Sequence, residues 1–77
     1  MSKNYIENET FSQQDFTAEE LPLGEYEQCT FRQCDFSNSN LSRRIFVECE
    51  FVDCDLSMTK LGETAFRDVQ FKQCKIA

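Results

Sequence analysis

The chain of 77 residues carries a net charge of −6, with five cysteines and no histidine. A chain this short forms one small domain, and its acidic balance argues against direct binding of nucleic acid, which requires Lys and Arg to neutralise phosphates. No apolar run reaches the roughly 18 residues of a membrane span, and the N-terminus lacks the basic flank and apolar stretch of a signal peptide. We therefore expect a cytoplasmic protein that binds neither membrane nor nucleic acid directly.

A large apolar residue recurs at every fifth position from residue 6 to residue 76. A period of five fits neither the 3.6 residues of a helical turn nor the alternation of a flat strand. The residue two places earlier is often small, as at Cys29, Cys34, Ser39, Cys49, Cys54, Thr59, Thr64, Val69 and Cys74. Two inward positions separated by one outward position indicate a short extended segment, and the remaining residues turn a corner.

Three blocks, 34–38, 39–43 and 54–58, read as a small residue, Asp or Asn, Leu or Phe, and two further residues. This pattern resembles the pentapeptide-repeat family, and the resemblance extends over residues 4–77. It implies an all-β fold, a right-handed quadrilateral β-helix in which four pentapeptides make one coil of about twenty residues. We expect one such domain over residues 1–77, with fewer than four coils.

Stacked coils should repeat the same chemistry every twenty residues, and the sequence does so. The columns are Phe11, Phe31, Phe51, Phe71; Phe16, Phe36, Leu56, Ile76; Leu21, Leu41, Leu61; and Ile6, Tyr26, Phe46, Phe66. Aromatic residues thus follow aromatic residues in most columns, whereas one column is leucine throughout. This agreement independently favours coils of twenty residues.

The pattern is interrupted in the first coil and again near residue 44. Glu9, Gln14 and Glu19 are too polar for the inward position of small residues, so we expect residues 1–24 to form an irregular or capping coil and residues 25–77 to form regular coils. Arg44 occupies the same kind of position, where an unpaired guanidinium would be very costly to bury. We expect the chain at Arg43 and Arg44 to bulge outward, or the Arg44 side chain to leave along a corner.

All five cysteines occupy the small inward position, which favours packing as small buried hydrophobes. Disulfides between stacked thiols and a zinc site are the alternatives. Parallel ladders do not bring Cβ atoms together as a disulfide needs, and zinc needs four converging ligands. The chain also has no histidine base and no glycine-rich phosphate loop. We expect no catalytic residues, cofactor or metal.

Acidic residues form two candidate interaction faces. Asp15, Asp35 and Asp55 make an outward column, and Glu25, Glu27, Glu48 and Asp68 make a second cluster. Each aspartate can accept hydrogen bonds from its own turn; alternatively, the row of like charges imitates the phosphates of DNA. The alternative draws on the resemblance to Qnr-type family members, which imitate DNA and bind DNA gyrase or topoisomerase IV. We expect the chain to lack the length, projecting loop and C-terminal helix of those members.

The last residues keep apolar groups in or near the inward register. They are Val69, Phe71, Cys74 and Ile76. Because an open solenoid end exposes its core, we expect a second copy to cover this end in an end-to-end homodimer; the alternative is that the chain is part of a longer repeat protein. The preferred function is a non-catalytic scaffold or protein-interaction module, and the alternative is a DNA-mimicking modulator of gyrase or topoisomerase IV.

Overall fold

The computed structural model describes residues 4–76, which form two parallel sheets of four short strands each. The first sheet has the order β1-β3-β5-β7, with β1 Asn4–Glu7, β3 Gly24–Glu27, β5 Ile45–Val47 and β7 Ala65–Arg67. The second has the order β2-β4-β6-β8, with β2 Thr10–Ser12, β4 Thr30–Arg32, β6 Glu50–Val52 and β8 Gln70–Lys72. This part of the chain contains no helix long and apolar enough to cross a membrane.

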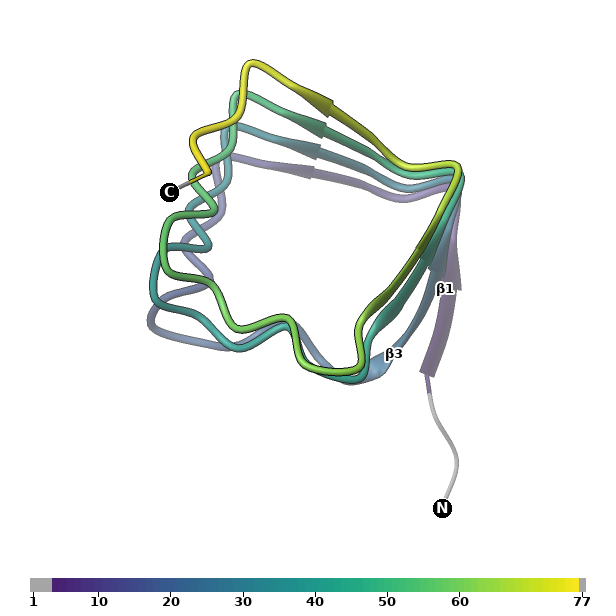
Figure 1. Cartoon of the computed structure of the whole chain (residues 1–77). Coiled ribbons are helices and arrows are strands. Elements are labelled where there is room, and N and C mark those ends of the chain that lie inside the picture. Colours follow the sequence, from purple (N-terminus) through teal and green to yellow (C-terminus); the bar gives the residue numbers. More distant parts are fainter. Residues whose placement is uncertain (1–3, 77) are drawn as a thin grey trace.

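Each of the strands β1 to β6 pairs in parallel with the strand twenty residues further along the chain. Phe11 pairs with Phe31, and Phe31 pairs with Phe51, so the columns anticipated from the sequence are the ladders of the fold. Viewed along their common axis, the coils overlie one another as four-sided outlines (Figure 1). The predicted all-β solenoid with fewer than four coils is therefore confirmed.

On the other two sides of the coils, isolated bridges occur in place of strands. Asp35 bridges to both Asp15 and Asp55, and Asn40 bridges to Lys60. Turns follow closely on these bridges, because the extended segment on these sides is only about one residue long. The sequence period does not distinguish these sides from the two that form sheets.

The corners of the coils use left-handed backbone at residues other than glycine. Among residues 4–76, twelve such residues have a positive φ, each two places after an inward apolar residue. They are Asn8, Gln13, Gln28, Gln33, Asn38, Arg43, Glu48, Asp53, Met58, Glu63, Asp68 and Gln73. The conformation costs about 1 kcal/mol or more per residue, but it directs the corner N–H toward the next coil. The N–H of Asn8, for example, donates to the Glu27 carbonyl at 3.0 Å.

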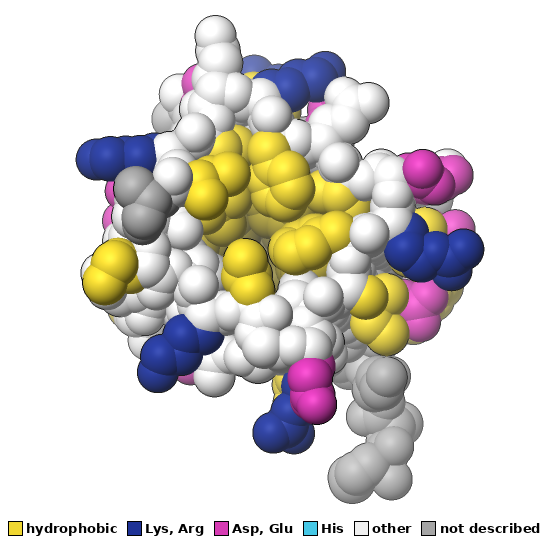
Figure 2. Space-filling model, in the orientation of Figure 1, with side chains coloured by type: hydrophobic (Ala, Val, Ile, Leu, Met, Phe, Trp, Pro, Cys, Tyr) yellow, Lys and Arg dark blue, Asp and Glu magenta, His cyan; other side chains and the backbone are white. Residues whose placement is uncertain are grey.

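The core is a set of aromatic columns inside the coils. Along a column the rings stack, as for Phe31 and Phe51, whose centroids are 4.7 Å apart with planes at 10°. Between columns the rings meet edge to face, as for Phe31 and Phe36 at 5.8 Å and 70°. Both arrangements suit the ring quadrupole. The columns reach the C-terminal end, where apolar side chains gather at the centre of the molecule (Figure 2).

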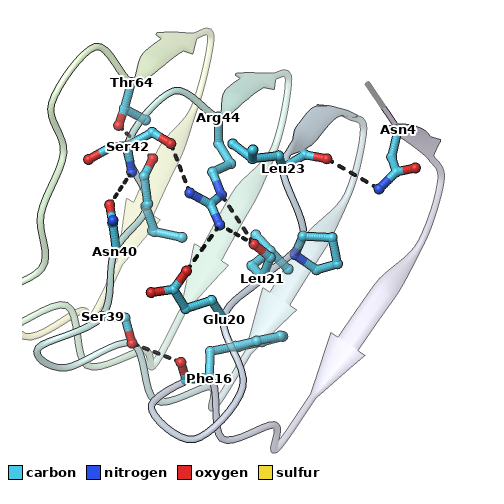
Figure 3. A network of polar contacts seen from close by, with 12 residues as sticks. Asn4, Phe16, Glu20, Leu21, Leu23, Ser39, Asn40, Ser42, Arg44 and Thr64 are labelled. Carbon is cyan, nitrogen blue, oxygen red and sulfur yellow. Dashed lines mark hydrogen bonds and ion pairs between the residues drawn. The ribbon is translucent and has the colours of Figure 1, made fainter. Parts of the chain in front are cut away.

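Arg44 corrects one expectation from the sequence, because it neither bulges outward nor leaves along a corner. It is buried, with 5% of its surface exposed, and the neighbouring strand β5 keeps its register. Its Nη1 donates to the Ser42 carbonyl at 2.8 Å, and its Nε and Nη2 donate to the Leu21 carbonyl (Figure 3). An ion pair of 3.8 Å with Glu20 adds to these contacts. The guanidinium is tolerated because its donors are paired, which removes most of the burial penalty.

Candidate functional site

The small inward residues share a role that their size alone does not reveal. Each thiol or hydroxyl at this position donates to the carbonyl of the large inward residue 23 positions earlier, whereas Val69 has no donor. Cys49 Sγ lies 3.2 Å from the Tyr26 oxygen, and Thr59 Oγ1 lies 2.8 Å from the Phe36 oxygen. Arg44 follows the same rule with Leu21. The position therefore selects Cys, Ser and Thr as compact donors for carbonyls that the ladders do not use.

This role occupies the groups that could otherwise act as nucleophiles. All five thiols are free, and four of them are buried; Cys74 is half-buried. Burial raises the pKa of Cys29 and of Cys49, which keeps both thiols protonated. A reactive cysteine needs a lowered pKa and access to solvent. The hydrogen bond with Cys54 lowers the pKa of Cys34, but Cys34 is buried like the other three and lacks this access. The buried cysteines are consequently structural donors.

The predicted aspartate column is brought together, but its carboxylates are turned toward their own turns. Asp35 Oδ1 accepts from the Ser37 N–H at 3.0 Å and from the Ser37 hydroxyl at 2.7 Å. Asp15 makes the same pair of bonds with Thr17, and the Thr17 hydroxyl is the largest cause that lowers the Asp15 pKa. Each aspartate therefore stabilises a turn by accepting from residue i+2.

The same column changes sign at its C-terminal end. Asp55 bridges to Lys75, so the row of carboxylates ends beside an ammonium group. The acidic stripe is thus confined to three successive coils.

The second acidic cluster is divided between two surfaces. Glu25 and Glu27 lie on strand β3 of the first sheet, with Ile45 and Val47 beside them on strand β5. Glu48 and Asp68 instead line a corner groove of about 420 Å³ between the two sheets. Neutral or acidic polar side chains complete its polar lining: Asn8, Gln28, Thr30, Glu50 and Gln70.

Glu50 belongs to this groove although sequence reasoning did not select it. It is the first residue of strand β6, in the column that also holds Thr30 and Gln70. Its carboxylate pairs with Lys72 at 2.7 Å. Among residues 4–76, Glu48 and Asp68 make no ion pair, so they supply the free negative charge of the groove. The sequence signal that could have identified Glu50 is its outward position next to a corner.

The predicted dimer end lies at the open C-terminal coil. Phe71 is 40% exposed and Ile76 is 63% exposed, whereas Val69 and Cys74 are half-buried. Leu61 and Phe66, which the prediction omitted, are exposed beside them. With deeper core residues, the exposed Leu61, Phe66, Phe71 and Ile76 line an apolar cavity of about 190 Å³. The exposed apolar end therefore includes Leu61 and Phe66 as well as the predicted residues.

Comparisons with known proteins agree with this architecture. A family model described as a pentapeptide repeat region matches residues 25–77. The structure is similar to that of QnrB1, a plasmid-mediated fluoroquinolone resistance protein, with a TM-score of 0.59 and 23% identity. That similarity covers 92% of this chain but only 34% of QnrB1, so the chain spans about a third of that protein's length.

A second solved structure is similar over most of both chains. It is the pentapeptide repeat protein Rfr23 from the cyanobacterium Cyanothece 51142, with 8% identity and a TM-score of 0.49. The similarity covers 95% of this chain and 88% of Rfr23. A search of curated proteins gave no match.

Proposed function

Because the chain belongs to the pentapeptide-repeat family, we propose that it is a non-catalytic, cytoplasmic module that binds another protein. The observation that carries this proposal is where the polar and charged side chains lie in the coils. Thiols and hydroxyls donate to carbonyls inside the coils, whereas Glu48 and Asp68 of the corner groove are exposed. Such a surface binds partners by charge and shape.

The corner groove is the proposed docking surface. Glu48 and Asp68 stand one above the other in successive coils, both at left-handed corners. The fixed backbone holds their carboxylates along the groove, so a partner with basic side chains at a similar spacing would gain two charged contacts. A basic protein segment is therefore the expected occupant, and its binding should weaken as ionic strength rises.

Affinity capture from extracts of the cells that make this protein tests the groove. We expect the unmodified chain to retain a basic protein at low salt. The variant that carries both Glu48→Lys and Asp68→Lys should not retain it. Asp53→Lys is the matched control, because Asp53 is also an acidic residue at a left-handed corner but does not line the groove. Equal retention by the groove variant and the control would contradict the proposal.

A second candidate function is modulation of DNA gyrase or topoisomerase IV by DNA mimicry. The stacked bridges of Asp15, Asp35 and Asp55 favour it, because they keep like charges at the spacing of adjacent strands, which ladders normally avoid. The fold similarity to QnrB1 is consistent with it but comprises a third of that protein.

A supercoiling assay separates the two candidates. DNA mimicry predicts that micromolar protein changes gyrase activity and that Asp35→Lys with Asp55→Lys abolishes the effect. An unchanged supercoiling rate would rule out DNA mimicry. The corner groove would then still be tested by the capture experiment.

We also propose that a second copy of the chain covers the C-terminal end. The apolar surface of Phe71 and Ile76, together with half-buried Val69 and Cys74, supports this contact. Burying this surface in an end-to-end contact would continue the core from one molecule into the next. Such self-association leaves the corner grooves on the sides of the coils free for another partner.

A further inference from the structure

We propose that the second copy binds this end with its own opposite end, so that molecules stack head to tail. The N-terminal coil, residues 4–23, would lie on the C-terminal coil, residues 64–76, in the register of the existing ladders. This inference rests on the self-association proposed above and names the surface of the second copy that makes the contact. Three independent features of the two coils support it.

The first feature is the direction of the backbone groups at the C-terminal edge. Inside the molecule, the Glu48 N–H donates to the coil above it, and the Cys49 carbonyl accepts from that coil. The equivalent groups of the last coil are the Asp68 N–H and the Val69 carbonyl. They present a donor followed by an acceptor to whatever lies on this end.

The N-terminal edge presents the complementary order. Inside the molecule, the Glu27 carbonyl accepts from the coil below and the Thr30 N–H donates to it. The equivalents in the first coil are the Glu7 carbonyl and the Thr10 N–H. Head-to-tail stacking therefore continues the parallel ladders unchanged, whereas two C-terminal ends facing each other would have to pair antiparallel.

The second feature is the match between apolar columns. Advancing each column by one coil places Phe11 of the second copy on Phe71, and Phe16 of the second copy on Ile76. The spacing needed is that of stacks already present, since Phe11 and Phe31 have centroids 4.9 Å apart with planes at 9°. Phe11 and Phe16 are half-buried at present, so each has surface left to cover.

The third feature is charge complementarity along the outward columns. One column runs Glu7, Glu27, Val47, Arg67, so the next residue on Arg67 would be Glu7 of the second copy. The column of Asp15 ends at Lys75, which would face Asp15 of the second copy. Both contacts are between opposite charges, which favour a ladder pair.

The alternative arrangements join like charges. Residues 64–76 hold three bases against one acid, and residues 4–23 hold five acids and no base. Two C-terminal coils facing each other would therefore bring basic rims together, and Lys and Arg side chains are visible around this end (Figure 2). Two N-terminal coils would bring acidic rims together. Only head-to-tail stacking pairs the acidic end with the basic end.

A head-to-tail contact uses two different surfaces and does not close on itself. We expect light scattering over a dilution series to show a mass that rises with concentration through the dimer to larger species. Glu7→Arg and Arg67→Glu should each raise the concentration of half-association about fivefold, the size of one exposed charge pair. The chain carrying both changes should recover to within about twofold, because the pair is restored with its signs exchanged.

Asp53→Arg is the control, since this exposed corner residue belongs to neither end coil. Circular dichroism would show that each variant keeps the fold. A mass that stops at the dimer, or a Glu7→Arg variant that associates like the unmodified chain, would overturn the inference. A monomer at every concentration would overturn it as well and point to another cover for this end.

The outcome is distinguishable from failure of the proposed groove. If the chain does not stack but still captures a basic partner through Glu48 and Asp68, only the head-to-tail inference is wrong. If the chain stacks but captures no partner, the docking surface is wrong and the inference stands.

Discussion

At single positions, the stability of this protein depends on side chains that donate to carbonyls inside the coils. Arg44 does so for the first coil, where its guanidinium binds the Leu21 carbonyl. Thr64, in the next coil of the same column, binds the Leu41 carbonyl at 2.7 Å with a hydroxyl. The same position is thus satisfied by a long or a short donor, provided that the donor reaches the oxygen.

Replacing the buried arginine tests this role. Arg44→Met keeps the apolar stem but removes the donors, and we expect a loss of about 1–3 kcal/mol in the free energy of unfolding, measured in urea. Arg44→Thr should lose less, because a hydroxyl can reach the same carbonyl. Glu20→Gln should cost under about 1 kcal/mol, since the Glu20 side chain is 59% exposed. If Glu20→Gln lowered the free energy of unfolding as much as Arg44→Met, the ion pair and not the bond to the Leu21 carbonyl would account for the stabilisation.

Left-handed corners provide a second test at single positions. Met58 has φ of 57° and is 70% exposed, so its side chain contributes little packing. Asparagine tolerates this backbone conformation better than methionine, and a β-branched residue tolerates it worse. We expect Met58→Asn to raise the free energy of unfolding by about 0.5 kcal/mol and Met58→Val to lower it by at least as much. The opposite order in urea unfolding would mean that the corner is not strained.

At the scale of one side of the coils, the aspartate column links turn geometry to pH. The pKa of Asp15 is lowered by the hydrogen bonds from Thr17, so the folded state favours the ionised carboxylate. A lowered pKa stabilises the fold above the ordinary value of 3.8, and this contribution is lost as pH falls below that value through the lowered pKa.

Removing the hydroxyl should therefore weaken the dependence of stability on acid pH. We expect Thr17→Val to reduce the difference between the urea midpoints at pH 7 and pH 3, with most of its effect at pH 7. Thr10→Val makes the same chemical change on strand β2 and serves as the control. An equal shift at both pH values would show that Thr17 acts by packing and not through the Asp15 carboxylate.

The cysteine columns can be mapped by their reactivity with a thiol reagent. Four thiols are buried and Cys74 is half-buried in the last coil. Because thiol reaction requires access as well as a thiolate, we expect Cys74 to react first in the folded protein at concentrations too low for self-association, and the other four to react only on unfolding. Cys74→Ser keeps a donor for the Phe51 carbonyl and should remove the fast phase. Rapid reaction of several thiols would contradict the closed core.

At the scale of the whole molecule, the period of five predicted the solenoid because it sets which side chains face inward. The same period could not predict the role of Arg44, since its acceptor is a backbone oxygen 23 residues away in another coil. It also missed Glu50, because the groove arises where two sheets meet at a corner. Glu25 and Glu27, grouped by charge with Glu48, lie on the first sheet and do not line the groove. Distances across a corner depend on turn geometry and are not encoded in the repeat.

The claim that the outward corner groove carries the function is tested most directly by site-specific photocrosslinking in the cells that make this protein. A photoreactive residue at position 48 should join the chain to a basic partner, and Asp68→Lys in the same chain should abolish the product. The same residue at position 53, on another corner, should give no such product. Identical products from both positions, or none from position 48, would contradict the account.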